Sequence, residues 1–207
     1  MADLLEQAAV SPAESGAGEA PVVSADFEIV PLKGLPIVGV ILAALVVSIA
    51  TNKAWPIDFF HVAGGGMWTA LDLFLGLVIG PILGRLSITA RVEFVRRFMP
   101  KMVLIMPTLV ISTLAGGWQL ARQVGDLNAN YVDHSWLVAS FIVVAVMAVI
   151  ALGVLEPANI AVLFELKKPQ PNGQVIATLM KRFIVTAGIT GIMQIATLVI
   201  MTRLATS

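Results

Sequence analysis

The sequence contains no cysteine, only two histidines and few charged residues. The absence of cysteine excludes disulfides, iron–sulfur clusters, thiolate metal sites and cysteine nucleophiles. Walker loops, dinucleotide fingerprints and serine–histidine arrangements are also missing, so no common hydrolytic or nucleotide-binding site is indicated. Charged residues make up 13% of the chain, and its formal net charge is +0. No basic cluster is interleaved with aromatic residues, so we expect no nucleic-acid partner.

Hydrophobic residues are what the chain has in excess, because they make up 58% of it and the mean hydropathy is +0.92. A soluble domain of this composition would not stay in solution, so the expected class is an all-α polytopic membrane protein in a lipid bilayer. The first apolar stretch reads as a plain anchor helix, and the others as a four-helix core over residues 57–203. The five predicted transmembrane helices lie at about residues 34–50, 57–83, 102–120, 136–155 and 183–201.

The distribution of charge predicts how the chain crosses the membrane. Residues 84–101 carry five basic residues against one acid, and residues 165–182 form a second basic segment. We interpret both as cytoplasmic loops, because Lys and Arg accumulate on the cytoplasmic side of membrane proteins. The N-terminus is then cytoplasmic and the C-terminus outside, in a bacterial-type inner membrane. Residues 1–33 are acidic and polar, which predicts a flexible tail or a segment that docks onto a partner subunit.

The second predicted helix concentrates polar residues that a lipid-facing surface would not carry. Two acids, an imidazole and an indole predict that their side of the helix faces other helices, a cofactor or water. At about 100° per residue, one narrow stripe contains Asp58, His61, Gly65, Trp68, Asp72 and Gly76. The third predicted helix carries a smaller polar stripe, typical of helix–helix contact or a pocket wall, with Thr108, Ser112, Gly116, Gln119 and Gln123.

Asp72 is the acid that this pattern places deepest, about four turns from the outer end of its helix. A free carboxylate at that depth is energetically costly. We therefore expect Asp72 to be protonated, paired with a group such as Gln194 near the middle of the last helix, or part of a proton path.

The last four predicted helices show a pattern that occurs twice. His61 is followed by a basic segment that ends in Arg96-Arg97-Phe98, and His134 by one that ends in Lys181-Arg182-Phe183. This pattern indicates either a parallel internal repeat of two hairpins or a chance similarity. If the repeat is real, His61 and His134 occupy equivalent positions near the outer face.

The two histidines allow three interpretations. They are interfacial residues in contact with water and headgroups, they share a haem, or they bind copper with neighbouring acids. For haem b, two neutral imidazoles supply axial ligands, while Gly65 and Trp68 lie beside the macrocycle. For Cu(II) or Zn(II), the predicted set combines carboxylates and imidazoles, namely Asp58, His61, Asp133 and His134.

The last four predicted helices carry the motifs Phe60-His61-Val-Ala-Gly-Gly-Gly-Met-Trp68-Thr-Ala-Leu-Asp-Leu-Phe74, Pro81…Arg85, Arg96-Arg97-Phe98 and Ala115-Gly116-Gly117. These motifs resemble the copper-resistance protein D-like superfamily, which includes oxygen-independent protoporphyrinogen oxidases with a four-helix haem-binding core. The resemblance covers about residues 57–203 and implies that His61, which opens its helix, is the functional ligand. The chain departs from the family pattern where the usual Trp-x-Gly step reads Trp68-Thr-Ala, and the enzyme activity is therefore not carried over.

These observations predict an integral membrane protein with a haem or copper site on its outer side, acting in electron transfer or copper handling. The alternative from a different class is a non-catalytic accessory subunit of a larger membrane complex. In either case the expected partners are other membrane subunits or further copies of the chain.

Overall fold

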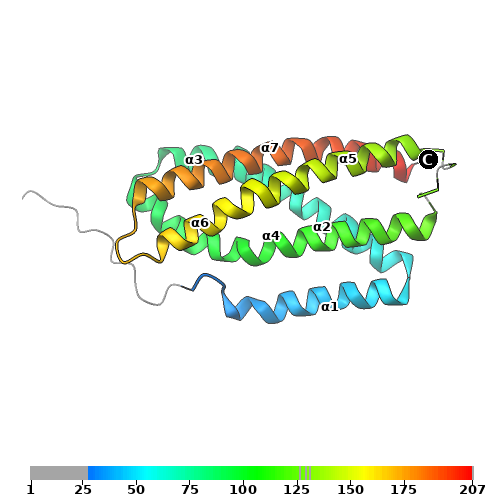
Figure 1. The fold of residues 1–207 in the computed structure, drawn as a ribbon, viewed down its shortest axis with the longest axis horizontal. Coiled ribbons are helices and arrows are strands. Elements are labelled where there is room, and N and C mark those ends of the chain that lie inside the picture. Colours follow the sequence, from blue (N-terminus) through cyan, green and yellow to red (C-terminus); the bar gives the residue numbers. More distant parts are fainter. Residues whose placement is uncertain (1–27, 126, 129, 131, 207) are drawn as a thin grey trace, which may run out of the picture.

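The computed structural model describes residues 28–125, 127, 128, 130 and 132–206, and all regular structure within them is helical. Five helical rods lie side by side (Figure 1), and each is long and apolar enough to cross a membrane. The prediction of an all-α chain with five such helices is therefore confirmed. The rods are η1 (Leu32–Gly34) with α1 (Leu35–Thr51); α2 (Ala54–Phe74), η2 (Leu75–Ile79) and α3 (Gly80–Arg85); α4 (Ile88–Val124); α5 (His134–Ile150), η3 (Ala151–Leu155) and α6 (Glu156–Leu166); and α7 (Gly173–Ala205).

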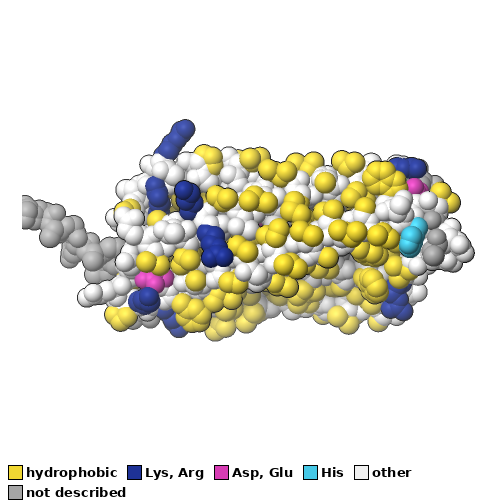
Figure 2. Space-filling model, turned by 45° about the horizontal axis from the view of Figure 1, so that its top comes forward, with side chains coloured by type: hydrophobic (Ala, Val, Ile, Leu, Met, Phe, Trp, Pro, Cys, Tyr) yellow, Lys and Arg dark blue, Asp and Glu magenta, His cyan; other side chains and the backbone are white. Residues whose placement is uncertain are grey.

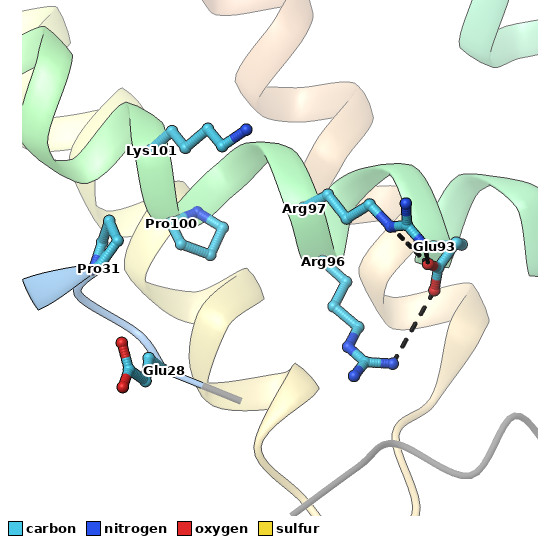
Figure 3. A pocket seen from close by; sticks show the side chains of 7 residues that line it. All are labelled: Glu28, Pro31, Glu93, Arg96, Arg97, Pro100 and Lys101. Carbon is cyan, nitrogen blue, oxygen red and sulfur yellow. Dashed lines mark hydrogen bonds and ion pairs between the residues drawn. The ribbon is translucent and has the colours of Figure 1, made fainter. Parts of the chain in front are cut away.

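Two antiparallel hairpins form the bundle. The rod α2–η2–α3 packs on α4, and the rod α5–η3–α6 packs on α7. Helix α7 also contacts α2 and α4, so it joins the two hairpins, whereas α1 lies at the edge of the bundle against α4 and α2. The predicted acidic tail lies mostly outside the described residues. Its described end, from Glu28 to Pro31, runs beside the start of α4 (Figure 3).

The two basic segments are mostly helical, so the prediction that residues 84–101 and 165–182 are loops is wrong. Only residues 86–87 and 167–172 connect the helices there. The Ser87 Oγ caps α4 by accepting a hydrogen bond from Ala90 N, and the Asn172 side chain caps α7. One turn further into α4, Glu93 accepts from Arg97 at 2.7 Å, an i,i+4 pair that supports the helix.

Each hairpin carries one π-helical turn at the same place relative to a proline. Gly80 N donates to Leu75 O in η2, and Glu156 N donates to Ala151 O in η3, both across five residues. Pro81 and Pro157 follow immediately. This shared irregularity supports the two-hairpin organisation that the sequence suggests. The histidines do not follow it, because His61 precedes Pro81 by 20 residues while His134 precedes Pro157 by 23.

The larger hydrophobic cluster and most of the basic residues lie toward the same end of the bundle. The larger hydrophobic cluster gathers where α3, α6 and the starts of α4 and α7 meet, and it includes Met99, Leu163 and Phe183. Figure 2 shows apolar side chains over the middle of the bundle and Lys and Arg toward its ends. Three of the 13 Lys and Arg residues lie at the end of the bundle that holds the α1–α2 turn and the end of α7, namely Lys53, Arg122 and Arg203. The others lie in the opposite half, which we call the basic half.

Candidate functional site

The polar stripe of the second rod faces the bundle interior over most of its length. Trp68 and Asp72 are buried, and His61 is partly buried, as the stripe predicts. Asp58 differs, because it lies in the second turn of α2 near the end of the bundle and is exposed. The stripe also changes partner along the rod. Its first part faces α4, and its second part faces α7.

His61 is held against α4 in a single orientation. Its Nδ1 lies 2.8 Å from the backbone oxygen of Thr113. A carbonyl oxygen only accepts hydrogen bonds, so Nδ1 carries the proton and donates it. A Cβ built on Gly117 would lie 2.6 Å from the imidazole Cε1, so this glycine leaves room for the ring. The geometry leaves Nε2 as the nitrogen of the neutral imidazole that can bind a ligand.

The glycine triplet of α2 serves helix packing at two of its three positions. A Cβ on Gly64 would lie 2.8 Å from Thr113 Oγ1, and one on Gly65 would lie 3.3 Å from Thr113 Cγ2. A Cβ on Gly66 would meet nothing within 4 Å. A glycine triplet would allow either a flat macrocycle or another backbone to approach α2 closely. In the structure the backbone of α4 makes this approach. Trp68 packs nearby with Met102 and Met106. A cofactor-binding role for Gly65 and Trp68 stays a prediction.

Asp72 lies in a buried polar cluster between α2 and α7. Its exposed fraction is 0%, and its Oδ2 accepts hydrogen bonds from Thr190 Oγ1 and Gln194 Nε2, both at 3.0 Å. The expected pairing of Asp72 with Gln194 is thus present. Two further acceptors in the cluster, Asp72 Oδ1 and Gln194 Oε1, have no partner among the described residues.

The Gln194 amide donates to one oxygen of the Asp72 carboxyl group, while the other carboxyl oxygen and the amide oxygen both lack a donor among the described residues. An ionised Asp72 would leave two buried oxygen acceptors without a donor, and unsatisfied buried polar groups cost about 1–3 kcal/mol each. A proton on Asp72 Oδ1 would convert that oxygen into a donor and so lower the number of buried acceptors that lack one. Of the three expectations for Asp72, the hydrogen-bond geometry therefore favours a protonated and paired acid.

Small residues bring α7 close enough for this cluster to form. A Cβ on Gly76 would lie 2.4 Å from the Gly188 Cα, and one on Gly191 would lie 3.0 Å from the Leu73 backbone nitrogen. Sequence reasoning missed Gly188, Thr190 and Gly191. The signal that could have found them is the group of small residues Ala187, Gly188, Thr190 and Gly191, interrupted only by Ile189, in an otherwise bulky apolar helix.

Asp133 and His134 lie at the start of α5, apart from the His61 contacts on α4. Asp133 is buried and forms an ion pair with Arg203 of α7 at 3.4 Å. The His134 Nδ1 is buried, with no hydrogen-bond partner among the described residues. Helix α5 packs chiefly on α7, whereas α2 packs chiefly on α4. Within the described part of the chain, no three His, Asp or Glu residues gather where they could hold a metal ion.

The polar stripe of α4 forms helix contacts, one of the two roles that its pattern allows. Gln119 Nε2 donates to the Asn52 side chain at 2.8 Å, and Gln123 Nε2 donates to the Asn52 backbone oxygen at 2.5 Å. Thr108 and Ser112 are buried, and a Cβ on Gly116 would lie 3.1 Å from His61 N. The stripe thus fixes the turn between α1 and α2 and the position of the His61 backbone.

The fold and the buried polar residues define the class as an all-helical protein with five helices able to span a membrane. No protein-family model, curated protein or solved structure matches the chain.

Proposed function

We propose that the protein is a multi-pass membrane protein that binds haem b through His61 Nε2 and acts in electron transfer. One observation carries this proposal: His61 Nδ1 donates to the Thr113 backbone oxygen. Histidines that ligate a metal commonly donate their other ring N–H to a carbonyl or carboxylate, which fixes the tautomer and aims the free nitrogen. The resemblance of residues 57–203 to the copper-resistance protein D-like superfamily independently points to the same histidine.

The packing around His61 supports a haem at the surface of the bundle rather than inside it. Thr113 fills the space beside Gly64 and Gly65, so a flat macrocycle has no room between α2 and α4. Apolar residues close in sequence to His61 and Gly117 are exposed, since Phe59, Val62 and Trp118 each have more than half of their surface accessible. We propose that a further membrane subunit or a second copy covers the other face of the haem.

Haem fits the available ligands better than copper does. A haem needs one or two axial ligands from protein, and bound haem iron supplies one-electron redox chemistry. Copper held by imidazoles and carboxylates needs several ligands at one point. The described residues provide no group of three. Copper handling would therefore require ligands from another chain.

The orientation in the membrane follows from the same charge argument as before. The basic half of the bundle faces the cytoplasm of a bacterial-type inner membrane, and the His61 half faces outward. The N-terminus is then cytoplasmic and the C-terminus outside.

The absorbance spectrum of the purified protein tests the proposal. Wild-type protein should show a Soret band and reducible α/β bands, and His61→Ala should lose them. His134→Ala is the matched control, since its ring lies on a different helix and should leave most of the haem bound. Equal haem content in wild type and His61→Ala would contradict the ligand role.

A second candidate is a non-catalytic accessory subunit of a larger membrane complex. It is favoured by the packing role of Gly64 and Gly65, whose space a second helix already occupies. Wild-type protein purified without any haem or copper, from cells supplied with both, would support this candidate over the first.

A further inference from the structure

We propose that the basic half of the bundle contains a binding site for one anionic phospholipid. A groove of about 580 Å³ runs between the rod η2–α3 and α7, and the start of α4 closes one side of it. The phosphate would bind at Arg91 and Lys181, and an acyl chain would lie along the apolar part of the groove. This inference is independent of the haem proposal and requires only that the bundle lies in a bilayer.

The charge of the groove is entirely positive. Arg91 and Lys181 line it, and none of the residues that line it is acidic. Arg91 is fixed in place, because its Nε donates to Leu86 O at 3.0 Å and its Nη2 donates to Gly84 O at 2.8 Å. Both bonds use backbone carbonyls at the end of α3, and no acid among the described residues pairs with the guanidinium charge. Lys181 is exposed one helix away.

The rest of the groove matches a hydrocarbon chain. Its walls include Ile184, Ile189 and Ile192 of α7, and Leu77 and Leu83 from the facing rod. Three glycines at four-residue intervals shape the facing wall, namely Gly76, Gly80 and Gly84. A Cβ on Gly84 would meet nothing within 4 Å, so the groove is open at this point.

Together these features favour a lipid over a soluble anion. Several groove residues are exposed apolar side chains on the outside of the bundle, including Leu77, Val185 and Ile192. In a bilayer these residues would face acyl chains. Basic pockets between transmembrane helices on the cytoplasmic side are typical sites for anionic headgroups. A free phosphate ion would contact the two cations but not the apolar part of the groove.

Electron paramagnetic resonance with spin-labelled lipids tests the proposal on the intact protein in phosphatidylcholine vesicles. Labelled phosphatidylglycerol should associate with the protein more strongly than labelled phosphatidylcholine. Replacing either cation, by Arg91→Gln or Lys181→Gln, should lower that preference about fivefold. Because Lys181 is exposed and has no side-chain hydrogen bond within the described part of the chain, Lys181→Gln keeps the test valid even if Arg91→Gln fails to fold. The double variant Lys53→Gln with Arg122→Gln removes two cations from the other half and should change nothing.

A second pair of variants tests the acyl chain. Gly84→Leu places a side chain in the open groove and should remove the site for both labelled lipids. Gly153→Leu is its matched control, because Gly153 is also an exposed glycine with open space around it but lies on η3, outside the groove. Wild-type protein without preference for the anionic lipid would overturn the proposal, as would unchanged binding in Gly84→Leu. Competition by inorganic phosphate as strong as by the lipid would identify a soluble-anion site instead.

Discussion

Gly76 of the second rod and Gly188 of α7 meet backbone to backbone, since a Cβ built on Gly76 would lie 2.4 Å from the Gly188 Cα. The two hairpins can come this close here because neither glycine has a side chain. The approach brings Asp72, one turn before Gly76, within hydrogen-bond distance of Thr190 and Gln194. The glycine pair therefore positions the buried polar cluster.

Gly76→Ala should destabilise the bundle, because the added methyl group cannot fit without moving one backbone. Overpacking of this kind costs about 1–3 kcal/mol. Gly66→Ala is the matched control in the same rod, because a Cβ there meets nothing within 4 Å. Unfolding in mixed detergent micelles, followed by circular dichroism, measures both variants. Equal stability of the two variants would show that the crossing of Gly76 and Gly188 has room for a methyl group.

Asp72→Asn should leave the bundle nearly as stable as wild type, because the Asn amide keeps an oxygen that accepts from Thr190 and Gln194. Asp72→Ala should cost about 1–3 kcal/mol, because it leaves Gln194 and Thr190 without their buried partner. The same unfolding assay measures the difference. Infrared spectroscopy adds an independent check at neutral pH. Asp72→Asn should remove a protonated-carboxyl band, and loss of a carboxylate band instead would contradict the protonated pair.

Gly117→Ala should displace the His61 ring, since the new methyl group would lie 2.6 Å from Cε1. If His61 is an axial ligand, Gly117→Ala should reduce haem retention, as His61→Ala should. Gly153→Ala, at a glycine with open space, should retain haem fully. The ratio of Soret absorbance to protein concentration measures retention. Full retention in Gly117→Ala would show that the ring orientation seen here does not control ligation.

Cysteine labelling should establish which end faces the cytoplasm, and the chain suits it because it has no cysteine of its own. Ser87→Cys, in the turn between α3 and α4, should be shielded from a membrane-impermeant reagent in intact cells. Asn128→Cys, between α4 and α5, should react. Both positions are exposed, so access to solvent alone does not distinguish them. The reverse pattern would place His61 on the cytoplasmic side.

Hydropathy was enough to locate the five helices, but it missed the helix ends that extend into the charged segments. The segment from Ile88 to Lys101 is helical although it is rich in charge, because Ser87 caps it and Glu93 pairs with Arg97. Hydropathy treats such a segment as a loop, since it detects only the apolar part of a helix. The π-turns also escape prediction, as they leave no mark in the apolar pattern beyond the proline that follows.

The sequence predicted the contacts of the candidate site that join two rare polar side chains. It did not predict the contacts that a side chain makes with a backbone group. Asp72 and Gln194 could be paired from sequence, because few polar side chains lie deep in apolar helices. Thr190 was missed since threonine in a helix commonly bonds to its own backbone, and Thr190 also lies 2.9 Å from Ala187 O. The contact of His61 with Thr113 uses a carbonyl, which every residue has, so no residue type could signal it.

The helical form of the basic segments has a consequence for whatever they bind. At about 1.5 Å per residue, the 37 residues of α4 are longer than the hydrocarbon core of a bilayer, which is about 30 Å thick. Its cations are therefore carried on a rigid rod instead of a flexible chain. The conformational entropy of arranging them is lost once, when the protein folds, and not again at each encounter. An anionic surface or partner thus meets an array of charges whose spacing is already set.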